Sequence, residues 1–175
     1  MIIDCHGHYT TAPKALADWR DKQIANLNTP ELGPKASELK ISDDELRESI
    51  ELNQLAKMKE RGSDLTIFSP RASFMAHHIG DFNVSSTWAA ICNELCYRVS
   101  QLFPDNFIAA AMLPQSPGVD PATCIPELEK CVNEYGNVGI NLNPDPSAAT
   151  GPARRCPIAT GIPSTKRWSS STSRP

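Results

Sequence analysis

Two histidines near the start of the chain are the residues whose type and spacing most plainly allow chemistry. His6 and His8 lie one residue apart, shortly after the apolar pair Ile2-Ile3. If this segment ends a strand, residues two apart point to the same face, so the two imidazoles come together. Neutral imidazole is a good ligand for Zn²⁺, which in catalytic sites keeps one coordination position open. The spacing therefore predicts a metal site at the end of the first strand.

The elements that would position these histidines alternate between apolar runs and helix-prone segments. Strands are predicted at residues 2–6, 65–69, 107–113 and 138–143, and helices at 14–28, 43–61, 85–103 and 121–135. The second helix has the clearest limits, because Ser42 and Glu45 form a capping box and Gly62 suits a helix end. Its apolar positions are predicted to be Leu46, Ile50, Leu55 and Met58. The alternation predicts an α/β fold with parallel strands and helical crossovers. A doubly wound sheet and a barrel both fit this pattern.

Composition excludes several classes of protein. The chain has 175 residues, of which 40% are hydrophobic and 21% charged, with a net charge of −3, as in ordinary globular proteins. This charge does not favour nucleic acid or an anionic membrane as a partner. No apolar run is long enough to span a bilayer, and no signal peptide is recognisable, so the cytoplasm is the expected location.

The cysteines are expected to be small buried residues rather than a disulfide framework, because no export signal precedes them. Cys92 and Cys96 are four apart in a predicted helix and should share a face. Cys5 should point away from His6 and pack, while Gly7 leaves the strand without a side chain between the two histidines. The six cysteines are Cys5, Cys92, Cys96, Cys124, Cys131 and Cys156.

The first-strand motif and several later stretches resemble a known group of enzymes. Ile-Asp-x-His-x-His is similar to the signature of the amidohydrolase superfamily, in its branch related to aminocarboxymuconate-semialdehyde decarboxylase. The stretches 2–10, 41–45, 67–73, 112–117 and 141–146 resemble the 4-oxalomesaconate hydratase family in particular. The resemblance is collinear and covers about residues 1–147.

The resemblance implies a (β/α)8 TIM barrel, of which about the first four βα units are present. It implies one zinc ion, with His6 and His8 as two ligands and a further His and a carboxylate from later strands. The implied reaction is reversible addition of water to the C=C bond of 4-oxalomesaconate, giving 4-carboxy-4-hydroxy-2-oxoadipate in protocatechuate or gallate breakdown. The family's acid–base residues lie mainly in the second half, so no catalytic residue is assigned here. Homo-oligomers of the full-length enzyme are left open.

Three residues are candidates for binding the polyanionic keto-acid substrate that the resemblance implies. Arg71, at the end of the second strand, could hold a carboxylate through two hydrogen bonds, with a surface ion pair as the alternative. His78, in the loop that follows, fits a substrate contact or a solvated histidine equally. Asn143 ends the fourth strand and could contact substrate or cap the next helix.

The resemblance stops near residue 148, and the sequence divides there. Residues 148–175 show no amphipathic period and close on a Ser/Thr-rich segment, as in a disordered tail. A codon choice for residues 163–175 read in another frame gives a hydratase-like helix, which predicts a frameshift between about residues 147 and 157. The expected consequence is an inactive, poorly soluble half-barrel with open sheet edges.

Two other functions remain open on the sequence. The first-strand motif alone would permit a decarboxylase or a hydrolase of the same superfamily. A non-catalytic half-barrel that assembles with a partner chain is the alternative from another class. The segments around Arg71 and Asn143 favour the hydratase.

Overall fold

Four parallel strands form one curved sheet in the order β1-β2-β3-β4. The structure is a computed structural model that describes residues 1–74 and 76–144. The strands are β1 (Ile3–Tyr9), β2 (Leu65–Pro70), β3 (Phe107–Met112) and β4 (Gly139–Asn141). Spatial order follows chain order without reversal, whereas a doubly wound sheet reverses direction part-way. The fold is therefore the half-barrel that the TIM-barrel prediction required.

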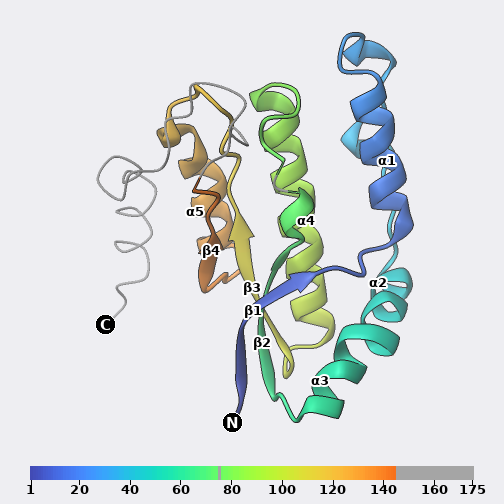
Figure 1. Cartoon of the computed structure of the whole chain (residues 1–175), viewed down its shortest axis with the longest axis vertical. Helices are drawn as coiled ribbons and strands as arrows, with labels where there is room; N and C mark the ends of the chain where they lie inside the picture. Colours follow the sequence, from blue (N-terminus) through green and yellow to red (C-terminus); the bar gives the residue numbers. More distant parts are fainter. Residues whose placement is uncertain (75, 145–175) are drawn as a thin grey trace.

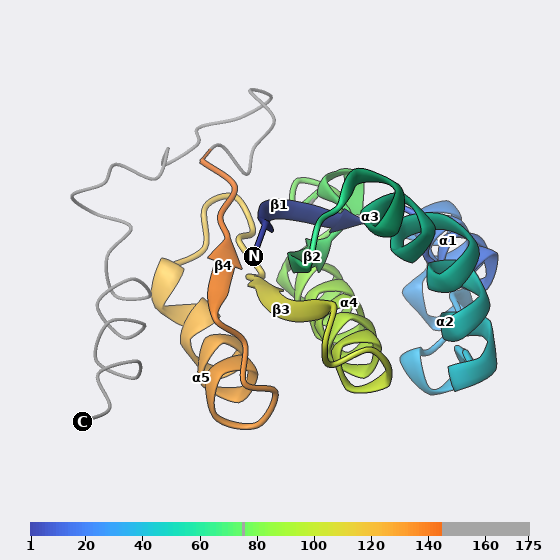
Figure 2. The same cartoon turned by 90° about the horizontal axis from the view of Figure 1, so that it is seen from below.

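The helices lie outside the arc of strands, as in a barrel (Figure 2). They are α1 (Lys14–Ala25), α2 (Asp43–Ser49), α3 (Ala56–Arg61), α4 (Phe82–Leu102) and α5 (Ile125–Asn133), with a π-helical segment at Ile50–Leu55 between α2 and α3. Short 3₁₀ turns lie at Pro30–Leu32, Ala36–Glu38, Ala72–Phe74 and Pro121–Cys124. The long helix α4 packs against β2 and β3, and α1 lies farther from the strands (Figure 1).

The main core lies between the outer face of the sheet and these helices. Phe68 of β2 and Phe107 of β3 are buried side by side, with ring centroids 4.9 Å apart. The apolar positions predicted for the second helix are all buried, which confirms the face assigned to it: Leu46, Ile50, Leu55 and Met58. Burial of such apolar surface contributes about 25 cal/mol per Å² and is the main force that holds the helices on the sheet.

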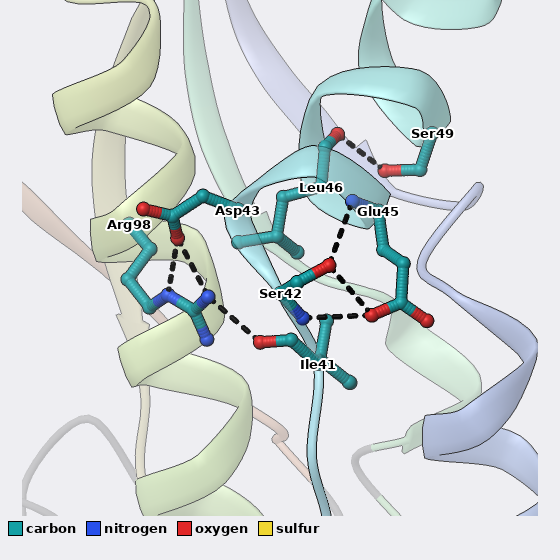
Figure 3. A network of polar contacts seen from close by, with 7 residues as sticks. All are labelled: Ile41, Ser42, Asp43, Glu45, Leu46, Ser49 and Arg98. Atoms are coloured by element: carbon teal, nitrogen blue, oxygen red, sulfur yellow. Dashed lines mark hydrogen bonds and ion pairs between the residues drawn. The ribbon is translucent and has the colours of Figure 1, made fainter.

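The start of α2 is fixed by polar contacts that the capping box predicts (Figure 3). The Glu45 backbone N–H donates to Ser42 Oγ at 3.2 Å, and the Ser42 N–H donates to the Glu45 carboxylate at 2.7 Å. Arg98 of α4 donates to Asp43 Oδ1 at 2.6 Å and to the Ile41 carbonyl at 2.8 Å. The cap therefore also ties α2 to the long helix that covers the sheet.

The predicted elements all occur, and the differences lie in their limits. The helix between Ser42 and Gly62 is interrupted by the π-helical segment, and Gly62 ends it with a φ of 69°. The helix predicted at 85–103 begins at Phe82, because Asp81 accepts a hydrogen bond from the Val84 N–H and caps it. The first turn predicted for 121–135 is a 3₁₀ turn rather than α-helix.

The cysteines are buried as expected, with one exception. Cys92, Cys96, Cys124 and Cys131 are buried and unpaired, and burial raises the pKa of Cys92 to about 12. The prediction that Cys5 packs is wrong, because Cys5 lies exposed on β1, the edge strand of the described sheet. Cys156 lies outside the described residues.

The predicted tail, residues 148–175, and the proposed frameshift region also lie outside the described residues. Within residues 1–74 and 76–144, no helix combines the length and apolar character needed to cross a membrane.

Candidate metal centre

The two histidines of β1 meet at the carboxyl end of the strand. The Nε2 atoms of His6 and His8 are 3.1 Å apart, and their rings are nearly perpendicular, with centroids 4.8 Å apart. Both side chains are accessible, His6 more than His8. The structure therefore brings together the pair that the spacing singled out.

A bulge in β1 contributes to this arrangement. Asp4 pairs with Thr66 and Gly7 with Phe68, so three steps along β1 match two along β2. The Asp4 carboxylate accepts a hydrogen bond from the His6 backbone N–H at 3.0 Å, which gives that donor a partner at the irregular position. Bulges re-aim side chains next to functional sites. Simple alternation along the strand is thus only part of the reason that the rings converge.

Gly7 is required between the two histidines by close packing of β1 on β2. A Cβ at Gly7 would lie 2.1 Å from Thr66 Cγ2 and 3.1 Å from the Ile67 carbonyl oxygen. Thr66 is itself buried, so it has little room to move. A side chain at this position would push the end of β1 away from β2, and with it both imidazoles.

Hydrogen bonds fix the tautomer of His8. Its Nδ1 lies 3.1 Å from the Pro70 carbonyl oxygen and 2.9 Å from Ser69 Oγ. A carbonyl oxygen only accepts, so Nδ1 carries the proton and Nε2 keeps its lone pair. Ser69 Oγ in turn donates to the Gly7 carbonyl at 3.0 Å and accepts from Asn141 Nδ2 at 3.4 Å. Groups from β1, β2 and β4 together present the His8 lone pair toward His6.

This geometry fits two ligands of one metal ion. Two nitrogens bound to Zn²⁺ at about 2.0–2.1 Å and a tetrahedral angle lie about 3.3 Å apart, close to the observed 3.1 Å. Outer groups that hold the other ring nitrogen of a ligand histidine are a regular feature of metal sites. Within the described part of the chain, no group of three or more His, Cys, Asp or Glu could complete a site.

A cavity of about 700 Å³ opens beside the histidines. Its lining includes Asp4, His6 and His8 from β1, and Gln54 and Lys57 from the helix that follows the cap. Binding sites for small molecules commonly enclose about 300–1,000 Å³. The end of β1 that carries the two histidines therefore borders a space large enough for a small organic acid.

The three candidate substrate residues follow the carboxyl ends of strands but are held differently. Arg71 directly follows β2 and is exposed, and His78 is exposed in the next loop. Neither side chain makes a hydrogen bond or an ion pair with another described residue. Asn143 follows β4, where its backbone N–H donates to Gln115 Oε1 at 2.8 Å and its carbonyl accepts from Gln115 Nε2 at 2.9 Å.

His77, to which the sequence assigned no role, is buried beside the exposed His78. Its Nδ1 lies 2.8 Å from Ser85 Oγ, which ties the loop after β2 to α4. Burial, together with the nearby His78 and Arg20, lowers the pKa of His77 to about 4. His77 is therefore neutral at pH 7 and anchors the loop that carries His78.

Sequence reasoning also missed Ser69 and Asn141. Both are polar residues at the ends of apolar strands, which is a usable signal in a parallel sheet whose site lies at that end. Ser69 is 61 residues from its partner His8, and Asn141 is 72 residues from its partner Ser69, so only the strand order brings them together.

Comparison with known proteins decides the family. The sequence pattern of the family described as amidohydrolase matches residues 3–158. The chain belongs to the amidohydrolase family. This confirms the superfamily inferred from the first-strand motif and accounts for the half-barrel of four parallel strands.

Two hydratases are similar to this amidohydrolase chain. It is 58% identical over 146 residues to 2-keto-4-carboxy-3-hexenedioate hydratase of Sphingobium sp. strain SYK-6, covering 83% of the chain and 42% of that protein. It is 76% identical to 4-oxalomesaconate hydratase of Rhodopseudomonas palustris, whose crystal structure aligns with a TM-score of 0.81 over 87% of the chain and 44% of that enzyme. The chain thus spans less than half the length of these relatives. The hydratase resemblance inferred from the sequence is confirmed.

A more distant solved structure carries a metal. A dihydroxybenzoic acid decarboxylase from Polaromonas sp. JS666, with bound manganese and an inhibitor, is 26% identical with a TM-score of 0.50. The match covers 82% of the chain and 38% of that enzyme.

Proposed function

We propose that this chain supplies part of the active site of a zinc-dependent hydratase that adds water to the C=C bond of 4-oxalomesaconate. The product would be 4-carboxy-4-hydroxy-2-oxoadipate. The observation that carries the proposal is that the Nε2 atoms of His6 and His8 lie 3.1 Å apart. The hydrogen bond of His8 Nδ1 to the Pro70 carbonyl fixes the tautomer that leaves the His8 Nε2 lone pair available to a metal. Similarity to two hydratases, at 58% and 76% identity, supports the reaction class.

In this proposal His6 and His8 are two of the metal ligands. Further ligands would come from residues outside the described part, because the described residues hold no larger ligand cluster. A bound divalent ion such as Zn²⁺ would act as a Lewis acid toward oxygen atoms of the substrate. Manganese in the Polaromonas enzyme supports a divalent metal at this kind of site, and nitrogen ligands favour zinc.

The chain's own residues would bind and orient the substrate. Arg71 presents an exposed guanidinium that suits a carboxylate, and His78 lies in the loop that His77 anchors on α4. Asn143 sits on a backbone segment that Gln115 holds from both sides. Each residue follows a strand end, the edge of a parallel barrel where substrates bind. The general acid and base are expected outside the described residues.

A decarboxylase is the second candidate, because the Polaromonas relative is one. The identity to that enzyme is 26%, against 76% to the Rhodopseudomonas hydratase. The hydratase is therefore the better supported reaction.

The test measures hydration directly. The purified protein is given 4-oxalomesaconate with Zn²⁺, and loss of the ultraviolet absorbance of the conjugated C=C bond is followed. A chimera in which residues 1–144 replace the matching part of the Rhodopseudomonas hydratase supplies the groups that this part lacks. We expect the chimera to hydrate the substrate, to lose activity with a chelator, and to regain it with Zn²⁺. A metal-loaded chimera that releases CO₂ from carboxylated aromatic acids but does not hydrate 4-oxalomesaconate would favour the decarboxylase.

A further inference from the structure

The helix after the capping box contains a π-helical segment directly opposite the end of β1. Residues Ile50–Leu55 form this segment, between α2 and α3. Such wide turns are uncommon and often lie at functional sites. The segment shares the cavity lining with the two histidines, through Asn53 and Gln54.

The wide turn changes which side chains face the core. In a regular α-helix, residue 54 would lie over Ile50, because side chains four apart share a face. Here Ile50 is fully buried and Leu55, five residues on, is also buried at 7% exposure. The extra residue in the turn lets Leu55 take the core position and leaves Gln54 half-buried in the lining of the cavity.

Gln54 uses this position to hold the backbone of His8. Its Nε2 donates to the His8 carbonyl oxygen at 2.6 Å. Its Oε1 accepts from Thr11 Oγ1 at 3.0 Å, and the same hydroxyl lies 2.8 Å from the Ser49 carbonyl oxygen. The amide is thus held at both ends, which fixes the direction of its N–H toward β1.

A second contact ties the same helix to the residue after His8. The Tyr9 hydroxyl lies 2.6 Å from Ser49 Oγ, and that oxygen donates to the Leu46 carbonyl at 2.8 Å. Ser49 is the last residue of α2, close to the capped end that Figure 3 shows. Gln54 and Ser49 therefore hold β1 at two successive residues, His8 and Tyr9.

We propose that Gln54 is a positioning residue, which fixes the His8 backbone so that the imidazole reaches its bonds with Ser69 and Pro70 and directs Nε2 toward His6. Ser69 and Pro70 of β2 fix the ring of His8, and Gln54 of the π-helical segment fixes its main chain. The consequence for metal affinity rests on the proposed function, whereas the effect of Gln54 on His8 itself does not.

The first test compares two variants of the same segment in the full chain. Gln54→Met keeps the size of the side chain and removes its N–H. Asn53→Met is the matched control, because Asn53 lines the same cavity but donates only to Ser49 O. With Zn²⁺ alone as the probe, in competition with a chromophoric chelator, we expect Gln54→Met to weaken binding about tenfold, as loss of an outer-shell partner does. Asn53→Met should stay close to the wild type.

Nuclear magnetic resonance of the metal-free protein gives a readout that needs neither metal nor activity. The His8 carbonyl ¹³C signal should move upfield in Gln54→Met, and the ring ¹⁵N signals should show loss of the single Nδ1–H tautomer. Both signals should be unchanged in Asn53→Met. If the chimera that carries residues 1–144 binds no Zn²⁺ but these shifts occur in the metal-free chain, the proposed function fails and the positioning role stands.

Variants of Thr11 provide a rescue that leaves Gln54 in place. Thr11→Val removes the hydroxyl that holds the amide, and Thr11→Ser keeps it. We expect the His8 signals to shift in Thr11→Val and to return in Thr11→Ser. The positioning role is wrong if the His8 signals in folded Gln54→Met match those of Asn53→Met. Should Gln54→Met not fold, unchanged His8 signals in Thr11→Val would equally overturn it.

Discussion

The carboxyl ends of β1 and β2 carry the two halves of the proposed chemistry, and they are built differently. At the end of β1, His8 has its ring held by Ser69 and Pro70 and its backbone held by Gln54. At the end of β2, the side chain of Arg71 is exposed and makes no hydrogen bond or ion pair with another described residue. The strands are neighbours of one sheet, so the fold alone does not produce the difference.

The contrast fits the roles that are proposed for the two groups. Metal ligands need the correct tautomer and direction before the ion arrives, and fixed outer contacts supply both. A long cationic side chain that meets a mobile polyanion can take its final position when the substrate binds. The end of β1 is therefore the ordered part of the site, and the end of β2 is the adaptable part.

The largest expected effect is a difference in Zn²⁺ affinity between variants at the end of β1 and a variant at the end of β2. His8→Ala and His6→Ala should each weaken Zn²⁺ binding more than roughly a hundredfold, beyond the 10- to 100-fold typical of outer-shell changes. Arg71→Ala should leave Zn²⁺ affinity unchanged and, in the active chimera, raise KM for the tricarboxylic substrate. Competition with a chromophoric chelator measures the affinities. Equal Zn²⁺ affinities in His8→Ala and Arg71→Ala would remove the distinction between the two ends.

The second prediction concerns the close packing that keeps the end of β1 in place. Gly7→Ala should lower the free energy of unfolding by about 2–3 kcal/mol, the upper range for overpacking, because the new Cβ meets Thr66 Cγ2. Adding Thr66→Ala should restore part of this loss, since the contact with the Ile67 carbonyl remains. Chemical denaturation of the two single variants and the double variant gives the coupling energy. Strictly additive losses would show that the Thr66 methyl is not the obstacle.

The third prediction uses His77, the anchor of the loop after β2. Its pKa is lowered to about 4, so between about pH 4 and 6.5 the unfolded chain binds a proton that the folded chain does not. Stability should fall by about 2 kcal/mol as the pH drops through this window, and His77 should contribute no slope above it.

The variant His77→Asn should flatten that part of the pH profile. The exposed neighbour provides the control, since His78→Asn should leave the slope as it is. Denaturation midpoints at several pH values measure it. An unchanged slope in His77→Asn would show that His77 is not the group whose lowered pKa causes the slope.

The smallest expected effect concerns Ser69, which holds the ring of His8 at the end of β1. Ser69→Ala removes one of two acceptors for His8 Nδ1–H and leaves the Pro70 carbonyl. Zn²⁺ affinity should fall about tenfold, at the low end for an outer-shell change. Asn141→Ala, which touches only Ser69 in this cluster, should have a weaker effect. A larger loss in Asn141→Ala than in Ser69→Ala would mean that Asn141 contacts the metal or its ligands directly.

The order of elements and the first-strand pair were predictable because they depend on local patterns. The capping box at Ser42, the end at Gly62 and the convergence of His6 and His8 follow from residues within a few positions of one another. The polar surroundings of His8 were not predictable in this way. They depend on strand order and on register shifts that alternation along a single strand does not reveal.

The spacing of apolar residues contains a signal of the π-helical segment, although the predicted helix is a regular α-helix. The predicted core positions Leu46, Ile50, Leu55 and Met58 include one step of five, which a regular α-helix does not favour. All four are buried, so the apolar pattern was correct and the helix geometry was not. The error in Cys5 has a different cause, because edge strands expose residues that would be covered inside a sheet.

A zinc titration observed on the histidine rings tests the central claim most directly. The chain has four histidines, so long-range ¹H–¹⁵N spectra of the whole protein can be assigned with single His→Gln variants. The account predicts that Zn²⁺ shifts the Nε2 signals of His6 and His8 together and leaves those of the buried His77 unchanged. Zn²⁺ that shifts neither ring, or that binds His8 through Nδ1, would contradict it.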